Sequence, residues 1–391
     1  MIFPRQRSPI PLKFTLSTLY FLYFGVLGIY LPYFNLYCYR LGFSGFEIGS
    51  ISAMRTLATA LFPLIWGALA DRFSMRRPIF IFCHFTSTVI WAFYLVFTDF
   101  ATMFVITAFY GVFYAPLISF LESFSMDLLD TEKNRYGNLR AWGSIGFILM
   151  VTGVGRAIDI FSVEIIIPLI LTGSLLQSIL AFKVPQTARG KKFDFSAGAR
   201  YLWNRRVVFF LMAAFLMLTS HGTYYGFFSI HLENLGFAST FIGFAWALAV
   251  IAEIGIMIYS RPIFQRFSHE QVLIAAFAFT CLRWFVVAGA QSAWLIIVTQ
   301  MLHAFSYGAF HVASILYIDE LTPPAAKTLG QAINNAVTYG LGIMIGFFVN
   351  GIFFEIIGAP ALFAASSGLA LIGGLLMVFE TATRKTGGSG K

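Results

Sequence analysis

Charged residues are scarce in this chain. They make up 11% of its 391 residues, whereas an ordinary soluble domain carries roughly 25%. Hydrophobic residues make up 59%, and 46 residues are Phe. A chain of this composition cannot cover a water-facing surface, so we expect lipid to surround it. The composition excludes a peripheral protein and most soluble enzymes.

Cysteine is also rare, and several common motifs are missing. Cys38, Cys83 and Cys281 lie far apart in apolar segments, and no CxxC pair occurs, so neither a disulfide framework nor a metal site is predicted. The chain has no P-loop and no Rossmann glycine fingerprint, so we expect no nucleotide and no other cofactor. No small-residue cleavage site follows the basic N-terminal stretch. The first apolar run is therefore predicted to stay as a helix rather than to be removed as a signal peptide.

Long apolar runs dominate what is present. A bilayer core of roughly 30 Å requires roughly 20 apolar residues for each helix that crosses it, and about twelve segments reach that length. We therefore expect an all-α membrane protein. The predicted segments are 14–39, 46–70, 79–97, 103–128, 139–158, 165–182, 207–232, 239–264, 272–290, 295–318, 329–354 and 362–379.

The net charge of +9 invites a nucleic-acid partner, but the positions of the basic residues argue against one. If the N-terminus lies inside, all but five of the 26 Lys and Arg fall in the two tails and the inward loops. This is the positive-inside pattern. It predicts a bacterial inner-membrane protein with both termini in the cytoplasm, in contact with anionic lipid headgroups. The five exceptions are Arg40, Arg55, Arg140, Arg156 and Arg283.

The chain is predicted to consist of two similar halves. The one extended polar stretch, residues 183–206, is read as a linker on the cytoplasmic surface. It separates an N-terminal six-helix bundle at 1–182 from a C-terminal one at 207–391. Leu41-Gly42-Phe43 recurs as Leu235-Gly236-Phe237, 194 positions later. Parallel repeats of this kind place a substrate near the bilayer midplane, between the bundles.

A compact charged connection, GALADRFSMRR at 67–77, separates the second and third apolar segments. By spacing alone it is either an ordinary basic cytoplasmic loop or a gating element. The residues on which a gating role depends are Gly67, Asp71, Arg72, Arg76 and Arg77.

That connection resembles the signature Gly-x-x-x-Asp-Arg-x-Gly-x-Arg-Arg of the major facilitator superfamily, with Ser74 in place of the second Gly. YFGVLGIYLPYF (23–34), RYGNLRAWGSIGF (135–147) and LHAFSYGAFHVAS (302–314) resemble the branch of lactose permeases and 3-phenylpropionate transporters. The resemblance covers essentially the whole chain. It implies a secondary transporter that works by alternating access, with a small organic acid as substrate.

Ionisable side chains at membrane depth cost at least roughly 2.5–3.5 kcal/mol each, so they persist where they are paired, hydrated or functional. Glu253 lies near the middle of its segment, at a depth comparable with that of His311. A carboxylate and an imidazole can exchange protons near neutral pH. We expect Glu253, with His303 or His311, to couple transport to protons; structural hydrogen bonding is the alternative. By resemblance, Arg283 and His303 have the 20-residue spacing of an Arg and a His at the lactose permease coupling site.

Three arginines, Arg55, Arg140 and Arg283, favour an anionic substrate, because a guanidinium binds a carboxylate through two parallel hydrogen bonds. Glu122 and Arg140 lie on consecutive segments and form either a structural salt bridge or a substrate contact. Arg140 matches the sugar-binding Arg of the lactose permeases, whereas Ser119 stands at the position of their Glu. That departure argues against a sugar. The other predicted substrate contacts are Tyr307, Asn334 and Asn335.

The combined interpretation is a proton-coupled symporter of a small organic, aromatic-type acid, functional as a monomer and not an enzyme. Within the same class, the alternatives are a sugar or nucleoside symporter and a drug or metabolite exporter. From other classes, an integral-membrane enzyme would require a nucleophile or metal constellation, and a sensor would require a soluble output domain. The sequence shows neither.

Overall fold

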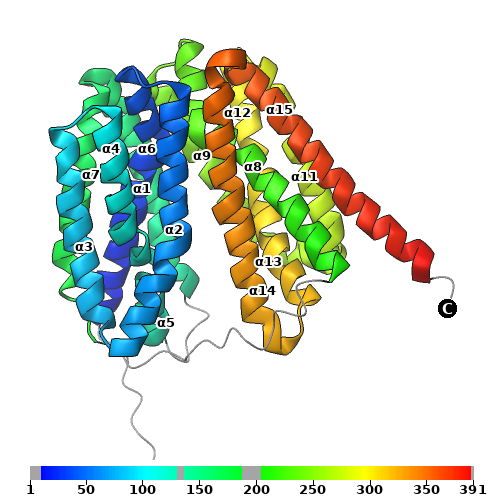
Figure 1. Ribbon diagram of the computed structural model, residues 1–391, viewed down its shortest axis with the longest axis horizontal. Helices are drawn as coiled ribbons and strands as arrows, with labels where there is room; N and C mark the ends of the chain where they lie inside the picture. The colour runs from blue at the N-terminus through cyan, green and yellow to red at the C-terminus, as the bar shows by residue number, and fades with distance from the viewer. Residues whose placement is uncertain (1–9, 130–135, 187–203, 389–391) are drawn as a thin grey trace, which may run out of the picture. The chain divides into compact units, whose positions relative to one another are not determined.

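The protein is helical throughout the part of the chain that its computed structural model describes, residues 10–129, 136–186 and 204–388 (Figure 1). The predicted all-α class is confirmed. Most of the predicted linker 183–206 lies outside these ranges. In chain order the elements are α1 (Ile10–Arg40), α2 (Gly45–Phe73), α3 (Arg76–Ala92), η1 (Phe93–Leu95), α4 (Phe100–Tyr114), α5 (Pro116–Leu129), α6 (Tyr136–Ile160), η3 (Val163–Ile165), α7 (Ile166–Ala181), α8 (Arg205–Asn234), α9 (Ser239–Ile258), α10 (Ser260–Arg266), α11 (His269–Gly289), α12 (Ala293–Met301), η5 (Ala304–Ala309), α13 (Phe310–Leu321), η6 (Pro324–Ala326), α14 (Lys327–Asn334), η7 (Asn335–Gly342) and α15 (Ile343–Gly388).

Eleven continuous helical stretches within the described ranges are long and apolar enough to cross a membrane. The last one, Lys327–Thr383, has 57 residues. It contains one non-helical residue, Gly358, with φ of 72° and ψ of 166°, and Pro360 follows two positions later. Because one crossing requires roughly 20 residues, this stretch is long enough for two. The structure therefore agrees with about twelve predicted segments, and the break lies between the last two of them.

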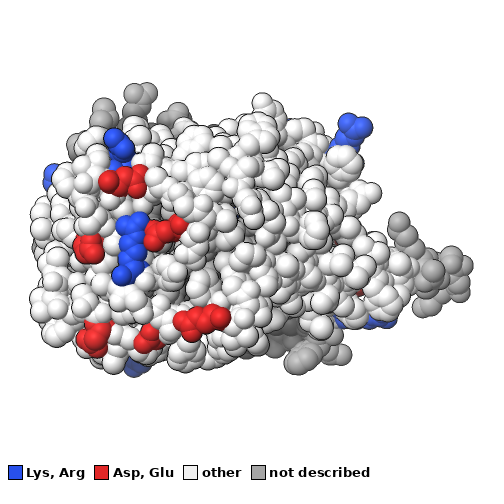
Figure 2. Space-filling model, turned by 90° about the horizontal axis from the view of Figure 1, so that it is seen from above, with Lys and Arg blue, Asp and Glu red and all other residues white. Residues whose placement is uncertain are grey.

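The helices expose large apolar side chains, as a lipid-facing surface requires. Leu64, Phe109, Leu149 and Phe285 are each more than half exposed. The view from above looks onto the ends of the helices, where Lys, Arg, Asp and Glu lie among residues of all other kinds (Figure 2). Water does not favour this much exposed apolar area, so the surface fits a bilayer.

The chain forms two compact units, 1–37 with 58–192, and 38–57 with 193–391. Aromatic packing fills the first unit. The Trp91 ring lies 5.7 Å from the Phe34 ring and 5.1 Å from the Tyr110 ring. The Trp91 indole N–H donates to the carbonyl of Ile167 at 3.0 Å. This contact satisfies the polar atom that such a ring brings into a core.

The second unit has a core built from α8, α11, α13 and α15, which includes Phe210, Phe277 and Phe310. Glycines allow α8 and α15 to approach closely. A Cβ at Gly222 would lie 2.6 Å from the Cα of Gly346. Small residues at helix contacts are the usual means of close packing in membranes.

The two copies of Leu-Gly-Phe have the same backbone geometry. Gly42 and Gly236 both adopt positive φ, 89° and 85°. The Gly42 N–H donates to the carbonyl of Tyr39, and the Gly236 N–H to that of Glu233. The following residues, Phe43 and Phe237, donate to carbonyls five positions back. Each helix thus ends in the same glycine cap, because only glycine adopts this conformation without a steric cost.

Asp99 shows how a polar residue begins a helix between two apolar spans. Its carboxylate accepts a hydrogen bond from the backbone N–H of Thr102 at 2.9 Å, at the start of α4. That hydrogen bond lowers the pKa of the Asp99 carboxyl below its usual value. The interaction satisfies one of the backbone donors that a helix start leaves unpaired.

Candidate functional site

Arg283 on α11 is the centre of the most connected buried polar group in the second unit. Its side chain is fully buried. Nε donates to the carbonyl of Thr299 at 2.9 Å, and one terminal nitrogen donates to Gln300 Oε1 at 3.1 Å. The other terminal nitrogen lies 2.7 Å from His303 Nδ1 and 3.2 Å from Ser306 Oγ. These four contacts occupy most of the donors that a guanidinium has.

Aromatic rings enclose the same guanidinium. Its central carbon lies 4.4 Å from the centroid of the Tyr224 ring and 4.4 Å from that of Trp284. The Tyr224 hydroxyl also donates to Gln300 at 3.0 Å. Cation–π contacts of this kind stabilise a desolvated cation. Arg283 is therefore held in place on all sides by the protein itself.

The contact with Arg283 determines which nitrogen of His303 carries a proton. A guanidinium only donates, so His303 Nδ1 accepts, and the proton of the neutral ring lies on Nε2. Nε2 is 3.9 Å from Glu253 Oε2. The three side chains thus form a line from Arg283 through His303 to Glu253, and the carboxylate at its end is 21% exposed, against 4% for His303.

An irregular helix positions this line. The predicted segment 295–318 is not one α-helix but α12, the π-helical turn η5 and α13. Such turns inside α-helices are frequent at functional sites. Gly308 lies within η5, and a Cβ there would come within 3.3 Å of Glu253 Cγ. The absence of a side chain at Gly308 therefore lets α9 bring Glu253 close to η5.

Tyr307 and His311 continue the polar stripe predicted on this segment. The His303 and Tyr307 rings are nearly parallel, with centroids 5.2 Å apart, and Tyr307 and His311 follow at 6.0 Å. His311 Nδ1 lies 2.6 Å from the hydroxyl of Tyr339 on η7. Glu253 thus contacts His303, and His311 contacts Tyr339. All of these rings except His303 are partly exposed.

Sequence reasoning missed several members of this group. Tyr224, Gln300 and His221 are fully buried and lie against Arg283 or its ring neighbours. His221 Nδ1 contacts the carbonyl of Met217 at 2.8 Å. Their position in the sequence could have indicated them, because a polar side chain inside an apolar membrane span costs free energy and therefore often marks a functional site.

Glu122 and Arg140 lie in the first unit. The Tyr136 hydroxyl donates to Glu122 at 3.3 Å, and the Arg140 guanidinium lies 3.7 Å from the centroid of the Phe24 ring. The described contacts of both residues are with aromatic side chains, Tyr136 for Glu122 and Phe24 for Arg140, and the predicted salt bridge between the two stays a prediction.

The remaining predicted substrate residues lie in the second unit. Arg55 is half-buried on α2. Asn334 is fully buried, donates to Ser314 Oγ at 2.9 Å and accepts from Thr338 at 3.0 Å. Asn335, the first residue of η7, is exposed. Of the two asparagines, only Asn335 is exposed.

The connection 67–77 joins α2 to α3. Arg76 donates to Asp71 Oδ1 at 2.8 Å and lies 3.6 Å from Asp127 Oδ2 near the end of α5. Arg77 donates to the carbonyls of Val184 and Phe182, just after α7, at 2.6 and 2.9 Å. Arg72 is exposed and lies over the Phe73 ring, and Gly67 has open space where a Cβ would be. The connection therefore ties together the ends of α2, α3, α5 and α7.

Ser74, at the position where the family signature has Gly, has φ of 56°. Among the described residues it is the only non-glycine residue with positive φ. The left-handed conformation costs a residue with a Cβ roughly 1–2 kcal/mol. The turn therefore has the shape of the glycine-containing signature, although this chain has a serine there.

We expect Ser74→Gly to stabilise the protein by about 0.5–1 kcal/mol, because the relief of the left-handed strain exceeds the added chain entropy of glycine. Thermal unfolding of the purified protein in detergent measures this. Ser74→Ala, which keeps the Cβ, is the control and should bring no gain. An equal gain from both variants would assign the effect to the lost hydroxyl.

The arrangement suits binding and proton exchange rather than bond-breaking chemistry. Among the described residues, no three His, Cys, Asp or Glu side chains are grouped so that they could hold a metal ion. Free cysteines are buried or half-buried. What the site offers is a partly exposed carboxylate, Glu253, backed by a neutral histidine and a fixed arginine.

Comparison with known proteins gives a consistent answer. Residues 13–365 match the family described as "MFS_1 like family". A probable 3-phenylpropionic acid transporter of Escherichia coli is 26% identical over 353 residues, covering 87% of this chain and 90% of that protein. The maltose permease of Geobacillus stearothermophilus is 23% identical and covers 95% of each. The crystal structure of the nucleoside transporter NupG shares the fold, with a TM-score of 0.84 at 19% identity, covering 94% of this chain and 98% of that one.

Proposed function

Because the chain belongs to the MFS_1 like family and is a multi-pass membrane transporter of small molecules rather than an enzyme, we propose that it is a proton-coupled symporter of a small organic acid. It works by alternating access, with bundles 1–182 and 207–391 moving about a central site and the linker 183–206 between them. The observation that carries the proposal is the line of Arg283, His303 and Glu253.

Glu253 carries the proton in this proposal, and His303 positions it. His303 accepts from Arg283 through Nδ1, so binding a proton there would break that hydrogen bond and place two cations side by side. Glu253 is the exposed end of the line. A protonated Glu253 is neutral, which lowers the cost of moving it through a dry intermediate. His311, which is hydrogen-bonded to Tyr339, is a second group that could accept the proton, and it lies on the same polar stripe as His303 and Tyr307.

The substrate is proposed to be an aromatic carboxylate. Most of the N–H donors of Arg283 are occupied by protein groups. We therefore assign the carboxylate of the substrate to Arg140 or Arg55 rather than to Arg283. Tyr307 and the rings beside it offer flat surfaces for an aromatic ring. Glu122, Asn334 and Asn335 complete the proposed set of contacts, with Asn334 acting through its bonds to Ser314 and Thr338. The 26% identity to a probable 3-phenylpropionic acid transporter supports this choice.

A nucleoside or sugar is the second candidate. Around Glu253 the partly exposed groups are hydroxyls and imidazoles on rings, Tyr307, His311 and Tyr339. Such groups hydrogen-bond a neutral, hydroxyl-rich or planar solute as readily as an acid. The relatives include a maltose permease and a nucleoside transporter of the same fold.

We place the protein in the bacterial inner membrane, as a monomer with both termini in the cytoplasm, on the strength of the basic inward loops. On that orientation the connection 67–77 lies on the cytoplasmic side. Asp71, Arg72, Arg76 and Arg77, with Gly67, then form the gating element. The bond of Arg76 to Asp71 and its approach to Asp127 would hold the helix ends together in one transport state.

We expect Glu253→Gln to abolish uphill accumulation while counterflow exchange continues, because glutamine keeps the shape and hydrogen bonds of a protonated carboxyl but cannot release a proton. Proteoliposomes with an imposed pH gradient measure both, with labelled 3-phenylpropionate, uridine and maltose tested in parallel.

The control is Glu164→Gln, an exposed acid outside the proposed site, which should leave both activities unchanged. Undiminished accumulation by Glu253→Gln would remove Glu253 from the coupling role. Transport of uridine or maltose alone would replace the organic acid by the second candidate.

A further inference from the structure

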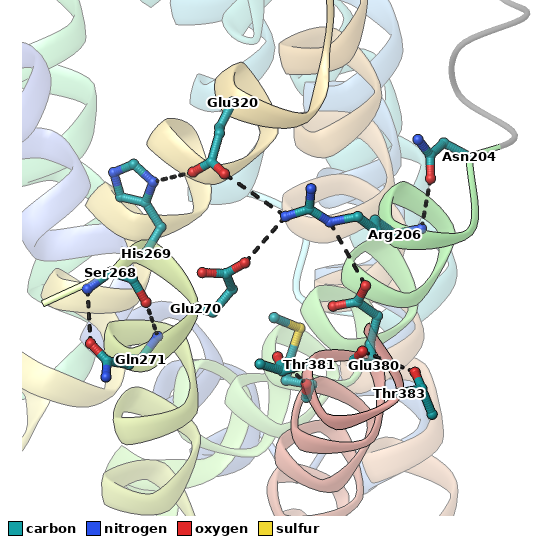
Figure 3. Close-up of polar contacts among 11 residues, drawn as sticks. Asn204, Arg206, Ser268, His269, Glu270, Gln271, Glu320, Glu380, Thr381 and Thr383 are labelled. Atoms are coloured by element: carbon teal, nitrogen blue, oxygen red, sulfur yellow. Dashed lines mark hydrogen bonds and ion pairs between the residues drawn. The ribbon is translucent and has the colours of Figure 1, made fainter. Parts of the chain in front are cut away.

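Five ionisable residues meet at the end of the second unit where α8 and α11 begin: Arg206, His269, Glu270, Glu320 and Glu380, here called the Arg206 cluster (Figure 3). Arg206 lies between three carboxylates, 3.2 Å from Glu270, 3.8 Å from Glu320 and 3.7 Å from Glu380. His269 Nδ1 lies 2.7 Å from the other oxygen of Glu320. The cluster connects α8, α11, α13 and α15.

The cluster has more negative than positive groups. Arg206 is its one permanent cation, and it faces three carboxylates. Glu380 is 5% exposed, and its Oε2 has no hydrogen-bond partner among the described residues. Buried carboxylates without enough donors are costly. A proton on His269 adds a second cation to the cluster at Glu320, because it converts that contact into a charge-assisted hydrogen bond.

In the first unit, the start of α3 and the end of α5 make a similar contact, with one chemical difference. Arg76 is the first residue of α3, and it lies 3.6 Å from Asp127, near the end of α5. His269 is the first residue of α11, and it lies 2.7 Å from Glu320, in the last turn of α13. Arginine is charged at every physiological pH. Histidine changes its charge between about pH 5 and pH 8.

We propose that the Arg206 cluster is a pH-dependent latch, in which protonated His269 holds the start of α11 to the end of α13 more tightly than neutral His269 does. The matching arginine pair in the first unit has no such dependence. A proton is therefore the ligand of the cluster, and the latch is separate from the coupling site at Glu253, which lies on α9.

Other charged groups near the cluster are already engaged. Asp319, beside Glu320, is paired with Lys327 of α14. Arg205 of α8 contacts Thr383 of α15 at 3.4 Å. The Phe264 ring of α10 lies 5.6 Å from the His269 ring, and Arg266, the last residue of α10, lies over the Phe267 ring. The Tyr317 ring lies beneath Arg206, 5.8 Å from its guanidinium carbon. Glu320 is thus the charged group that responds most directly to the proton on His269.

What the latch does in the cell depends on the proposed function and orientation of the protein. The existence of the latch does not depend on either. On that orientation the cluster faces the cytoplasm, into which a proton symporter releases protons. Cytoplasmic acidification would then hold α11 and α13 together more tightly at the cytoplasmic end of the second unit.

Hydrogen exchange of the backbone amides tests the latch without any substrate. Purified wild-type protein, His269→Arg and His269→Gln are compared at about pH 5 and about pH 8, with rates corrected for the intrinsic effect of pH. In the wild type, exchange at the start of α11 and the end of α13 should be about twofold to fivefold slower at the lower pH, the scale expected of a partly exposed ion pair. His269→Arg should be slow at both pH values and His269→Gln fast at both.

Two further variants separate the possible explanations. Glu320→Gln keeps the histidine but removes its partner, so it should also lose the pH dependence. Glu253→Gln should keep it, since the coupling site is not involved; this holds whether or not Glu253 couples transport to protons. The proposal is overturned if wild-type exchange in these two segments does not depend on pH, or if His269→Arg retains the wild-type dependence.

Discussion

Replacing Arg283 with methionine is expected to destabilise the protein by on the order of 3 kcal/mol, because each buried acceptor left without its donor costs roughly 1–3 kcal/mol. The acceptors are the carbonyl of Thr299, Gln300 Oε1 and His303 Nδ1. Methionine fills much of the same volume and packs against aromatic rings, so the loss reports on hydrogen bonding rather than on a cavity. Thermal unfolding in detergent measures the effect.

Two comparisons make the Arg283 result specific. Arg156→Met removes an exposed arginine from α6 and should change the midpoint of unfolding little. Arg283→Lys keeps the charge but cannot donate in four directions at once, so it should fall between methionine and the wild type. If Arg283→Met unfolded at the same temperature as Arg156→Met, the hydrogen bonds of Arg283 would not contribute to stability.

Gly146→Ala is expected to cost about 2–3 kcal/mol, the upper part of the range for overpacking. A Cβ at Gly146 on α6 would collide with the carbonyl oxygen of Phe21 and lie 2.9 Å from its carbonyl carbon. The obstacle is the backbone of α1, which cannot change rotamer, so the two helices must separate. A lowered midpoint of thermal unfolding is the expected observation.

Gly153→Ala on the same helix provides the matched control. A Cβ there would meet no atom within 4 Å, and alanine is the better helix former by about 0.5–1 kcal/mol. The two substitutions are chemically identical and differ only in what faces them. We expect Gly146→Ala to lower the midpoint of thermal unfolding and Gly153→Ala to raise it. A loss of equal size at both positions would show that the effect comes from replacing any glycine of α6 and not from the contact with α1.

The sequence by itself determined the class of the protein. With 11% charged residues and about twelve apolar segments, the chain must be helical in lipid, because only helices and closed barrels satisfy their backbone groups there. The repeated Leu-Gly-Phe predicted two equivalent turns, and both have the same glycine cap. The charged connection 67–77 and the family resemblance followed from local patterns, and Ser74 departs from the signature in residue type but not in backbone shape.

Only the tertiary structure decided which polar groups act together. Spacing placed Arg283 near His303, but the side-chain contacts determine that His303 accepts through Nδ1 and presents Nε2 to Glu253. Tyr224 and Gln300, which hold Arg283, come from other helices, and no local pattern connects them. Hydrophobic periodicity predicts which face of a helix is buried, but it does not predict which neighbour that face meets or where a helix widens into a π-turn. For that reason the line of Arg283, His303 and Glu253 and the Arg206 cluster became visible only in three dimensions.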